Sequence, residues 1–88
     1  MDFRYDPSKA ASNLRKHGVS FSEAKGVFAD PLAIYKEDPD AVGEFRFIAI
    51  GIGGNYRLLV VVYTLRDDVI RIISARRAKR YEVRAYEG

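Results

Sequence analysis

Arginines crowd the last quarter of the chain, and they are the side chains best suited to chemistry. The segment from Val69 to Arg84 reads Val-Ile-Arg-Ile-Ile-Ser-Ala-Arg-Arg-Ala-Lys-Arg-Tyr-Glu-Val-Arg, an apolar run that leads into a basic one. Guanidinium groups bind phosphate through paired hydrogen bonds and stabilise negative charge that develops in a reaction. Arg46, Arg66, Arg71, Arg76 and Arg77 therefore predict a concave site for a phosphate-bearing ligand, although Arg46 or Arg71 could instead pair with an acid such as Glu44.

The positive charge of the chain is concentrated rather than spread. The 88 residues include 15 Lys and Arg against 12 Asp and Glu, a net charge of +3. Basic and acidic side chains balance over residues 1–65, so the whole excess lies in residues 66–88. A localised basic surface is typical of nucleic-acid-binding proteins, whereas a solvated helix face is the plainer interpretation.

Tyrosines interleave with these charges. Tyr63 and Tyr81 could stack on a base and bond a phosphate, although both could equally be ordinary packing residues.

The composition excludes several kinds of site. The chain has no cysteine and one histidine, so we expect no disulfide, no metal and no cofactor. The one histidine, His17, has no serine in a nucleophile elbow to activate. No apolar run reaches the roughly 18 residues that span a bilayer, and the charged N-terminus is no signal peptide. We expect a soluble, cytoplasmic protein.

The first half of the chain predicts a helical hairpin. Asp6-Pro7 is a helix start and Gly18 a helix end, with Ala10, Ala11 and Leu14 as the apolar stripe between them. Ser20 to Glu23 forms a capping box that starts a second helix, which ends at Asp30-Pro31.

The second half predicts strands. Residues 32–36, 45–50, 57–65 and 69–73 are strand-like, and the third is apolar throughout, so it should be central. The short links make these strands antiparallel, and residues 3–5 could add an edge strand. Ser74 should cap a last helix from Ala75, which would place Arg76 and Arg77 at a helix start. We predict one α+β domain over residues 1–88: a small antiparallel sheet, an N-terminal helical hairpin and a C-terminal helix in the order β-α-α-β-β-β-β-α.

Across almost its whole length the chain resembles the BrnT family of bacterial toxins. The segments that carry the resemblance are Asp6-Pro7-x-Lys9-Ala10, Arg15-Lys16-His17-Gly18-Val19, Val27-Phe28-x-Asp30-Pro31-Leu32, Glu44-x-Arg46-Phe47-Ile48, Val61-Val62-Tyr63-Thr64-x-Arg66 and Ile70-Arg71-Ile72-Ile73-Ser74-Ala75-Arg76-Arg77-Ala78. The resemblance implies a RelE-like ribonuclease fold, cleavage of mRNA that inhibits translation, and a BrnA-like antitoxin with a ribbon-helix-helix region. It leaves open whether the ribosome takes part. Many relatives carry His where this chain has Tyr63.

Ribonuclease chemistry without a metal needs a base for the 2′-hydroxyl proton, cations for the phosphorane, and an acid for the leaving 5′-oxygen. Glu44 or His17 could be the base, and Tyr63 or an arginine could assist the leaving group. The predicted catalytic residues are His17, Glu44, Arg66, Arg76 and Arg77. The predicted RNA-binding residues are Arg46, Tyr63, Arg71, Lys79, Arg80 and Tyr81. The alternative is a basic module that binds RNA or the ribosome without cutting it, or the co-repressor subunit of a DNA-binding complex.

Overall fold

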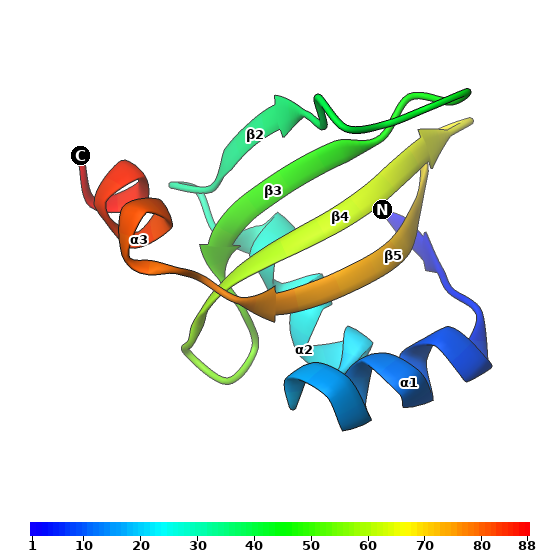
Figure 1. Cartoon of the computed structure of the whole chain (residues 1–88), viewed down its shortest axis with the longest axis horizontal. Helices are drawn as coiled ribbons and strands as arrows, with labels where there is room; N and C mark the ends of the chain where they lie inside the picture. The colour runs from blue at the N-terminus through cyan, green and yellow to red at the C-terminus, as the bar shows by residue number, and fades with distance from the viewer.

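The computed structural model describes all 88 residues, and its centre is a five-stranded sheet (Figure 1). The strands follow the order β1-β5-β4-β3-β2 across the sheet. Neighbouring strands from β2 to β5 are antiparallel, whereas β1 lies parallel to β5, so the sheet is mixed rather than wholly antiparallel. Their bounds are β1 (Asp2–Arg4), β2 (Ile34–Glu37), β3 (Phe47–Ile52), β4 (Leu58–Arg66) and β5 (Val69–Arg77).

The α+β class and the predicted order of helices and strands are confirmed. The strand β4 occupies the centre of the sheet, as its continuous apolar run predicts. The middle strands are shifted by one or two residues from the predicted ranges, which leaves Phe45 outside β3 and 76% exposed. No helix in the chain is both long and apolar enough to cross a membrane.

The helical hairpin begins and ends where its capping residues predict. Helix α1 (Pro7–His17) starts at Asp6, whose carboxylate accepts the Ser8 N–H at 2.9 Å, and ends at Gly18 with φ of +68°. Helix α2 (Phe21–Lys25) starts at Ser20, whose hydroxyl accepts the Glu23 N–H at 3.0 Å, and continues into a 3-10 turn, η1 (Gly26–Ala29). Both caps satisfy backbone donors that a helix start leaves unpaired.

The predicted apolar stripe of α1 is confirmed for Ala10, which packs against the core, but wrong for Ala11 and Leu14. Leu14 is 51% exposed and Ala11 is also exposed, while Asn13 is buried. The Asn13 amide accepts the Ala75 N–H at 3.1 Å and donates to the carbonyls of Ala75 at 2.8 Å and Val19 at 2.9 Å. The edge of β5 is free beyond the three-residue β1, so this amide takes the place of a neighbouring strand.

The predicted boundary between the last strand and the last helix is also wrong. Strand β5 continues through Ser74 and Ala75 to Arg77, and helix α3 (Arg80–Glu87) begins only after Lys79. Pairing of Ala75 with Val61 on one side and with Asn13 on the other overrides its helix propensity. Arg76 and Arg77 therefore lie on a strand rather than at the predicted helix start.

The hydrophobic core lies between the sheet and the helices α1 and α2, which cover one of its faces (Figure 1). On the opposite face Ile50 and Val60, which pair in register, are buried at the end of the sheet where α3 contacts β3. The rest of that face mixes half-buried apolar residues, such as Ile48, Val62 and Ile73, with polar and basic side chains. The core residues are Val19, Phe21, Ala24, Val27, Ala49, Leu59, Val61, Tyr63, Ile70, Ile72 and Ala75.

Candidate functional site

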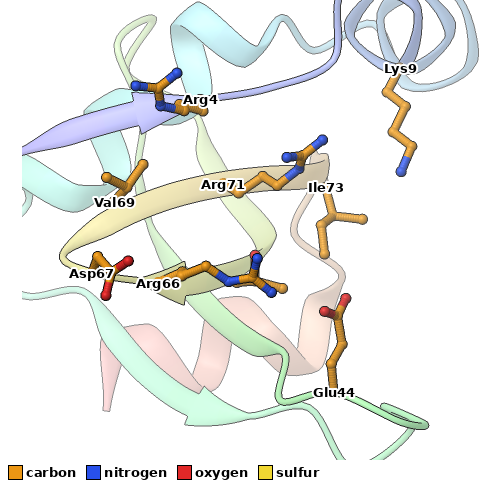
Figure 2. A pocket seen from close by; sticks show the side chains of 9 residues that line it. Arg4, Lys9, Glu44, Arg66, Asp67, Val69, Arg71 and Ile73 are labelled. Atoms are coloured by element: carbon orange, nitrogen blue, oxygen red, sulfur yellow. The ribbon is translucent and has the colours of Figure 1, made fainter.

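A hollow on the face of the sheet that α1 and α2 leave uncovered is lined mainly by charged side chains (Figure 2). We call it the basic groove. Four of its nine lining residues are cations and two are acids. The lining residues are Arg4, Lys9, Glu44, Thr64, Arg66, Asp67, Val69, Arg71 and Ile73.

Strand register builds the floor of the basic groove. Arg4 of β1 pairs with Arg71 of β5, which in turn pairs with Thr64 of β4, so the three side chains form a row across the sheet. Arg66 lies two residues beyond Thr64 and so points to the same face. Like charges that face each other across neighbouring strands destabilise a sheet. An anion bound over Arg4 and Arg71 would remove that repulsion.

Two side chains from outside the sheet close the basic groove. Lys9 extends from the first turns of α1, and Glu44 extends from the opposite side, from the loop between β2 and β3 (Figure 2). That loop is fastened at its base, where the Asp38 N–H donates to the Arg46 carbonyl at 2.8 Å and the Asp38 carboxylate lies 3.3 Å from the Arg46 guanidinium. Arg46 is thus paired with an acid of its own loop, one of the two arrangements that the sequence left open.

The cations of the basic groove have no acid partner. The chain forms three ion pairs, Arg46–Asp38, Arg57–Glu23 and Arg76–Glu82, and none includes Arg4, Lys9, Arg66 or Arg71. Glu44 and Asp67 line the same hollow without reaching ion-pair distance of any cation. The basic groove therefore carries an excess of positive charge that only an external anion can neutralise.

Arg76 pairs with an acid of the chain, although the sequence predicts that it binds a phosphate. Its guanidinium donates two hydrogen bonds of 2.8 Å to the Glu82 carboxylate, which also accepts the Lys79 N–H at 2.7 Å. The hydrogen bonds from Arg76 hold the pKa of Glu82 below its usual value, against the desolvation that raises it. This bidentate pair ties α3 to the end of β5.

The remaining predicted residues lie outside the lining of the basic groove. Arg77, Lys79, Arg80 and Tyr81 are all exposed near the junction of β5 and α3, and the Tyr81 side chain is 63% accessible. His17 is half-buried at the end of α1.

Tyr63 packs in the core on the face opposite Thr64. Its ring centre lies 4.9 Å from that of Phe28 and 5.7 Å from that of Phe47, and burial raises the pKa of its hydroxyl. The packing alternative that the sequence left open for this tyrosine matches its position. The structure thus brings together Glu44, Arg66 and Arg71 from the predicted set.

Sequence reasoning missed two cations of the basic groove, Arg4 and Lys9. The alternation in Phe3-Arg4-Tyr5 places Arg4 on the face away from the core, but only the parallel pairing of β1 with β5 brings it beside Arg71. Lys9 carries no local signal, because any exposed first-turn lysine looks the same in the sequence.

Comparisons with known proteins agree with this architecture. A crystal structure of the ribonuclease toxin BrnT from Brucella abortus superposes with a TM-score of 0.65, over 91% of this chain and 99% of that chain, at 23% sequence identity. At that identity the likeness shows the fold alone. The comparison with curated proteins gives no match. The family model described as the ribonuclease toxin BrnT of type II toxin–antitoxin systems matches residues 5–82. Since this match covers most of the chain, the protein belongs to the BrnT family of ribonuclease toxins.

Proposed function

We propose that this toxin is an endoribonuclease that cuts mRNA in the basic groove and thereby inhibits translation. The observation that carries the proposal is the convergence of four unpaired cations with two carboxylates, Glu44 and Asp67, in a single hollow. Cations attract and orient a phosphodiester, and a carboxylate beside them can accept a proton. Membership of a ribonuclease toxin family supports RNA as the polyanion.

The proposed reaction transfers the phosphodiester within the RNA chain. Glu44 takes the proton of the 2′-hydroxyl, and the freed oxygen attacks the neighbouring phosphorus. Arg66 and Arg71 stabilise the charge on the pentavalent phosphorane. Lys9 gives a proton to the 5′-oxygen as the bond to phosphorus breaks, which leaves a 2′,3′-cyclic phosphate on one fragment and a 5′-hydroxyl on the other. Glu44 is preferred to His17 as the base because only Glu44 lines the basic groove.

We propose that the reaction needs no metal ion. The donor set supports this, because the lining offers more cations than carboxylates, and no three histidine, aspartate or glutamate side chains in the chain lie close enough together to hold one. The test is cleavage of a single-stranded RNA by purified protein in EDTA, with the termini of the products identified. Loss of cleavage in EDTA that added magnesium restores would contradict metal independence.

Removal of the Arg71 guanidinium tests the assignment of the basic groove. We expect Arg71→Ala to lower the rate of RNA cleavage by about 10²–10³-fold, the usual effect of losing one donor to a charged transition state. Arg84→Ala, which removes an equally exposed charge from α3, should cleave at the wild-type rate. RNA that is retarded on a gel but left intact by the wild-type protein would favour the non-catalytic binding module instead.

The protein partner of this chain is inferred from its membership of a type II toxin–antitoxin family. A type II toxin acts with a protein antitoxin, and we propose that here it is a BrnA-like ribbon-helix-helix protein that binds the toxin in the cytoplasm, where mRNA is available. Co-expression should restore growth and yield a heteromeric complex in which RNA cleavage is lost. Growth arrest that persists while the two proteins co-purify would contradict neutralisation by this partner.

A further inference from the structure

A second hollow lies beside the basic groove, at the outer edge of the sheet. It is lined by Phe3, Arg4, Tyr5, Lys25 and Arg71, so it shares Arg4 and Arg71 with the groove. These two arginines are the paired residues of β1 and β5, and the two hollows meet across them. We propose that this second hollow, which we call the edge site, binds the stretch of RNA next to the cut phosphodiester. The inference rests on the function proposed above.

The charges of the edge site select an anion. Its lining contains three cations and no carboxylate. The Lys25 ammonium lies 5.7 Å from the ring centres of both Phe3 and Tyr5, and no acid lies within ion-pair distance of it. Aromatic faces attract a cation without neutralising it. The Lys25 ammonium is therefore available to bind an anionic ligand, and a phosphate of the RNA backbone is the anion that fits this surface.

The aromatic part of the edge site suits a nucleic acid better than a free anion. The Tyr5 side chain is 39% exposed, and its ring is fixed from behind by Phe21, with ring centres 5.4 Å apart. Rings held in this way provide apolar surface for a ribose or a base, and single-strand binding sites combine such rings with backbone-binding cations. Inorganic phosphate would use only the cations.

The position of the edge site gives it a distinct role from the basic groove. Glu44, Arg66 and Lys9 line only the groove, whereas Lys25 and Tyr5 line only the edge site. We expect an RNA of two nucleotides to occupy the groove alone. A longer strand that crosses the row of Arg4 and Arg71 also reaches Lys25. The edge site should therefore strengthen the binding of long RNA and leave the chemical step unchanged.

The test removes the Lys25 charge and compares RNAs of two lengths. Lys25→Gln is matched by Lys16→Gln, since both lysines are exposed in the last turn of a helix and Lys16 lines neither hollow. Binding of a 2′-O-methylated decamer, which cannot be cut, and cleavage of a dinucleotide are measured for each protein. We expect Lys25→Gln to weaken decamer binding about two- to fivefold, as for an exposed ion pair. The slope of log affinity against log salt should fall by about 0.7, the value for one phosphate contact on a single strand.

Each outcome decides between the two proposals. The edge site is supported if Lys25→Gln binds the decamer more weakly but cleaves the dinucleotide at the wild-type rate. Lys16→Gln should match the wild type in both measurements. Equal behaviour of the two variants on the decamer overturns the edge site and leaves the basic groove intact. If Lys25→Gln lowers dinucleotide cleavage as much as it lowers decamer binding, the edge site is also overturned. The Lys25 charge would then act on the basic groove from a distance instead of through a contact with longer RNA. Wild-type protein that neither binds the decamer nor cuts the dinucleotide overturns the ribonuclease groove and the edge site together.

Discussion

Glu44 is the residue on which the catalytic proposal depends most directly. It is the carboxylate that reaches the basic groove from the loop between β2 and β3, opposite the ends of Arg66 and Arg71 (Figure 2). Glu44 is a negative charge within a hollow of mainly positive charge. It therefore opposes the binding of phosphate, while it serves as the proposed base. The two effects can be separated by experiment.

We expect Glu44→Gln to slow RNA cleavage at saturating RNA by about 10²–10⁴-fold, the usual contribution of a general base. The same variant should bind uncleavable RNA as tightly as the wild type or more tightly, because one negative charge is removed from the hollow. Single-turnover cleavage and a binding titration measure the two effects. Asp40→Asn, in the same loop but outside the groove lining, is the control. A variant that cuts at the wild-type rate would remove Glu44 from the mechanism.

At the scale of elements, the end of β5 shows where local sequence reasoning succeeds and where it fails. Asp6-Pro7 and Gly18 set the bounds of α1 through short-range hydrogen bonds, so its ends could be predicted. Ser74 and Ala75 look like a helix start, yet they remain in the strand because residues far away in the sequence, Asn13 and Val61, take up the Ala75 backbone. Propensity gives way where tertiary partners are available.

The same distinction explains how much of the candidate site could be predicted. Arg66 and Arg71 lie near each other in sequence, on either side of one turn, so their proximity follows from the hairpin of β4 and β5. Arg4 joins them through a pairing of residues at opposite ends of the chain, which no local pattern reveals. Arg76 is predicted as a phosphate ligand from its place among the clustered arginines, and its pairing with Glu82 across the strand–helix junction has no local signal in the sequence.

Asn13 should be among the costliest polar residues to remove. Asn13→Ala leaves the backbone N–H and C=O of Ala75 and the C=O of Val19 buried without partners. We expect a loss of about 2–4 kcal/mol in the free energy of unfolding, even though alanine favours a helix. Urea denaturation measures it, with Ser12→Ala as the exposed neighbour on the same helix. Equal midpoints for the two variants would show that the amide does not support β5.

The attachment of α3 should depend on pH through Glu82. The pKa of this carboxyl is lowered in the folded protein, so the ion pair with Arg76 stabilises the fold above the unfolded pKa of about 4.5. That stabilisation is lost as the pH falls through the lower, folded value. We expect Glu82→Gln to cost about 1–3 kcal/mol at pH 7 and much less at pH 3. Urea denaturation at both pH values tests this, and a difference that stays constant with pH would contradict it.

For the whole molecule, RNA binding should raise stability markedly. The unpaired cations repel one another across the sheet in the free protein, and a bound polyanion both relieves this repulsion and binds only the folded state. At an RNA concentration 100 times the Kd, linkage gives about 2.7 kcal/mol, which corresponds to a rise in Tm of at least about 10 °C for a domain of this size.

Thermal unfolding with an uncleavable RNA measures this shift. The rise should shrink as salt is added, because salt screens the exposed charges. Arg71→Ala, which interrupts the row of cations, should show a smaller rise at the same RNA concentration. A shift that persists in high salt would point to an uncharged mode of binding.

The parallel pairing of β1 with β5 determines when the basic groove can assemble during synthesis of the chain. Arg4 lies far from its partner Arg71 in the sequence, so the row of cations can form only after β5 has been translated. A polypeptide that stalls or is truncated before that point lacks Arg71 together with the strand that aligns Arg4. We therefore expect a fragment that ends before β5 to lack RNA-cleaving activity, because it cannot assemble the basic groove.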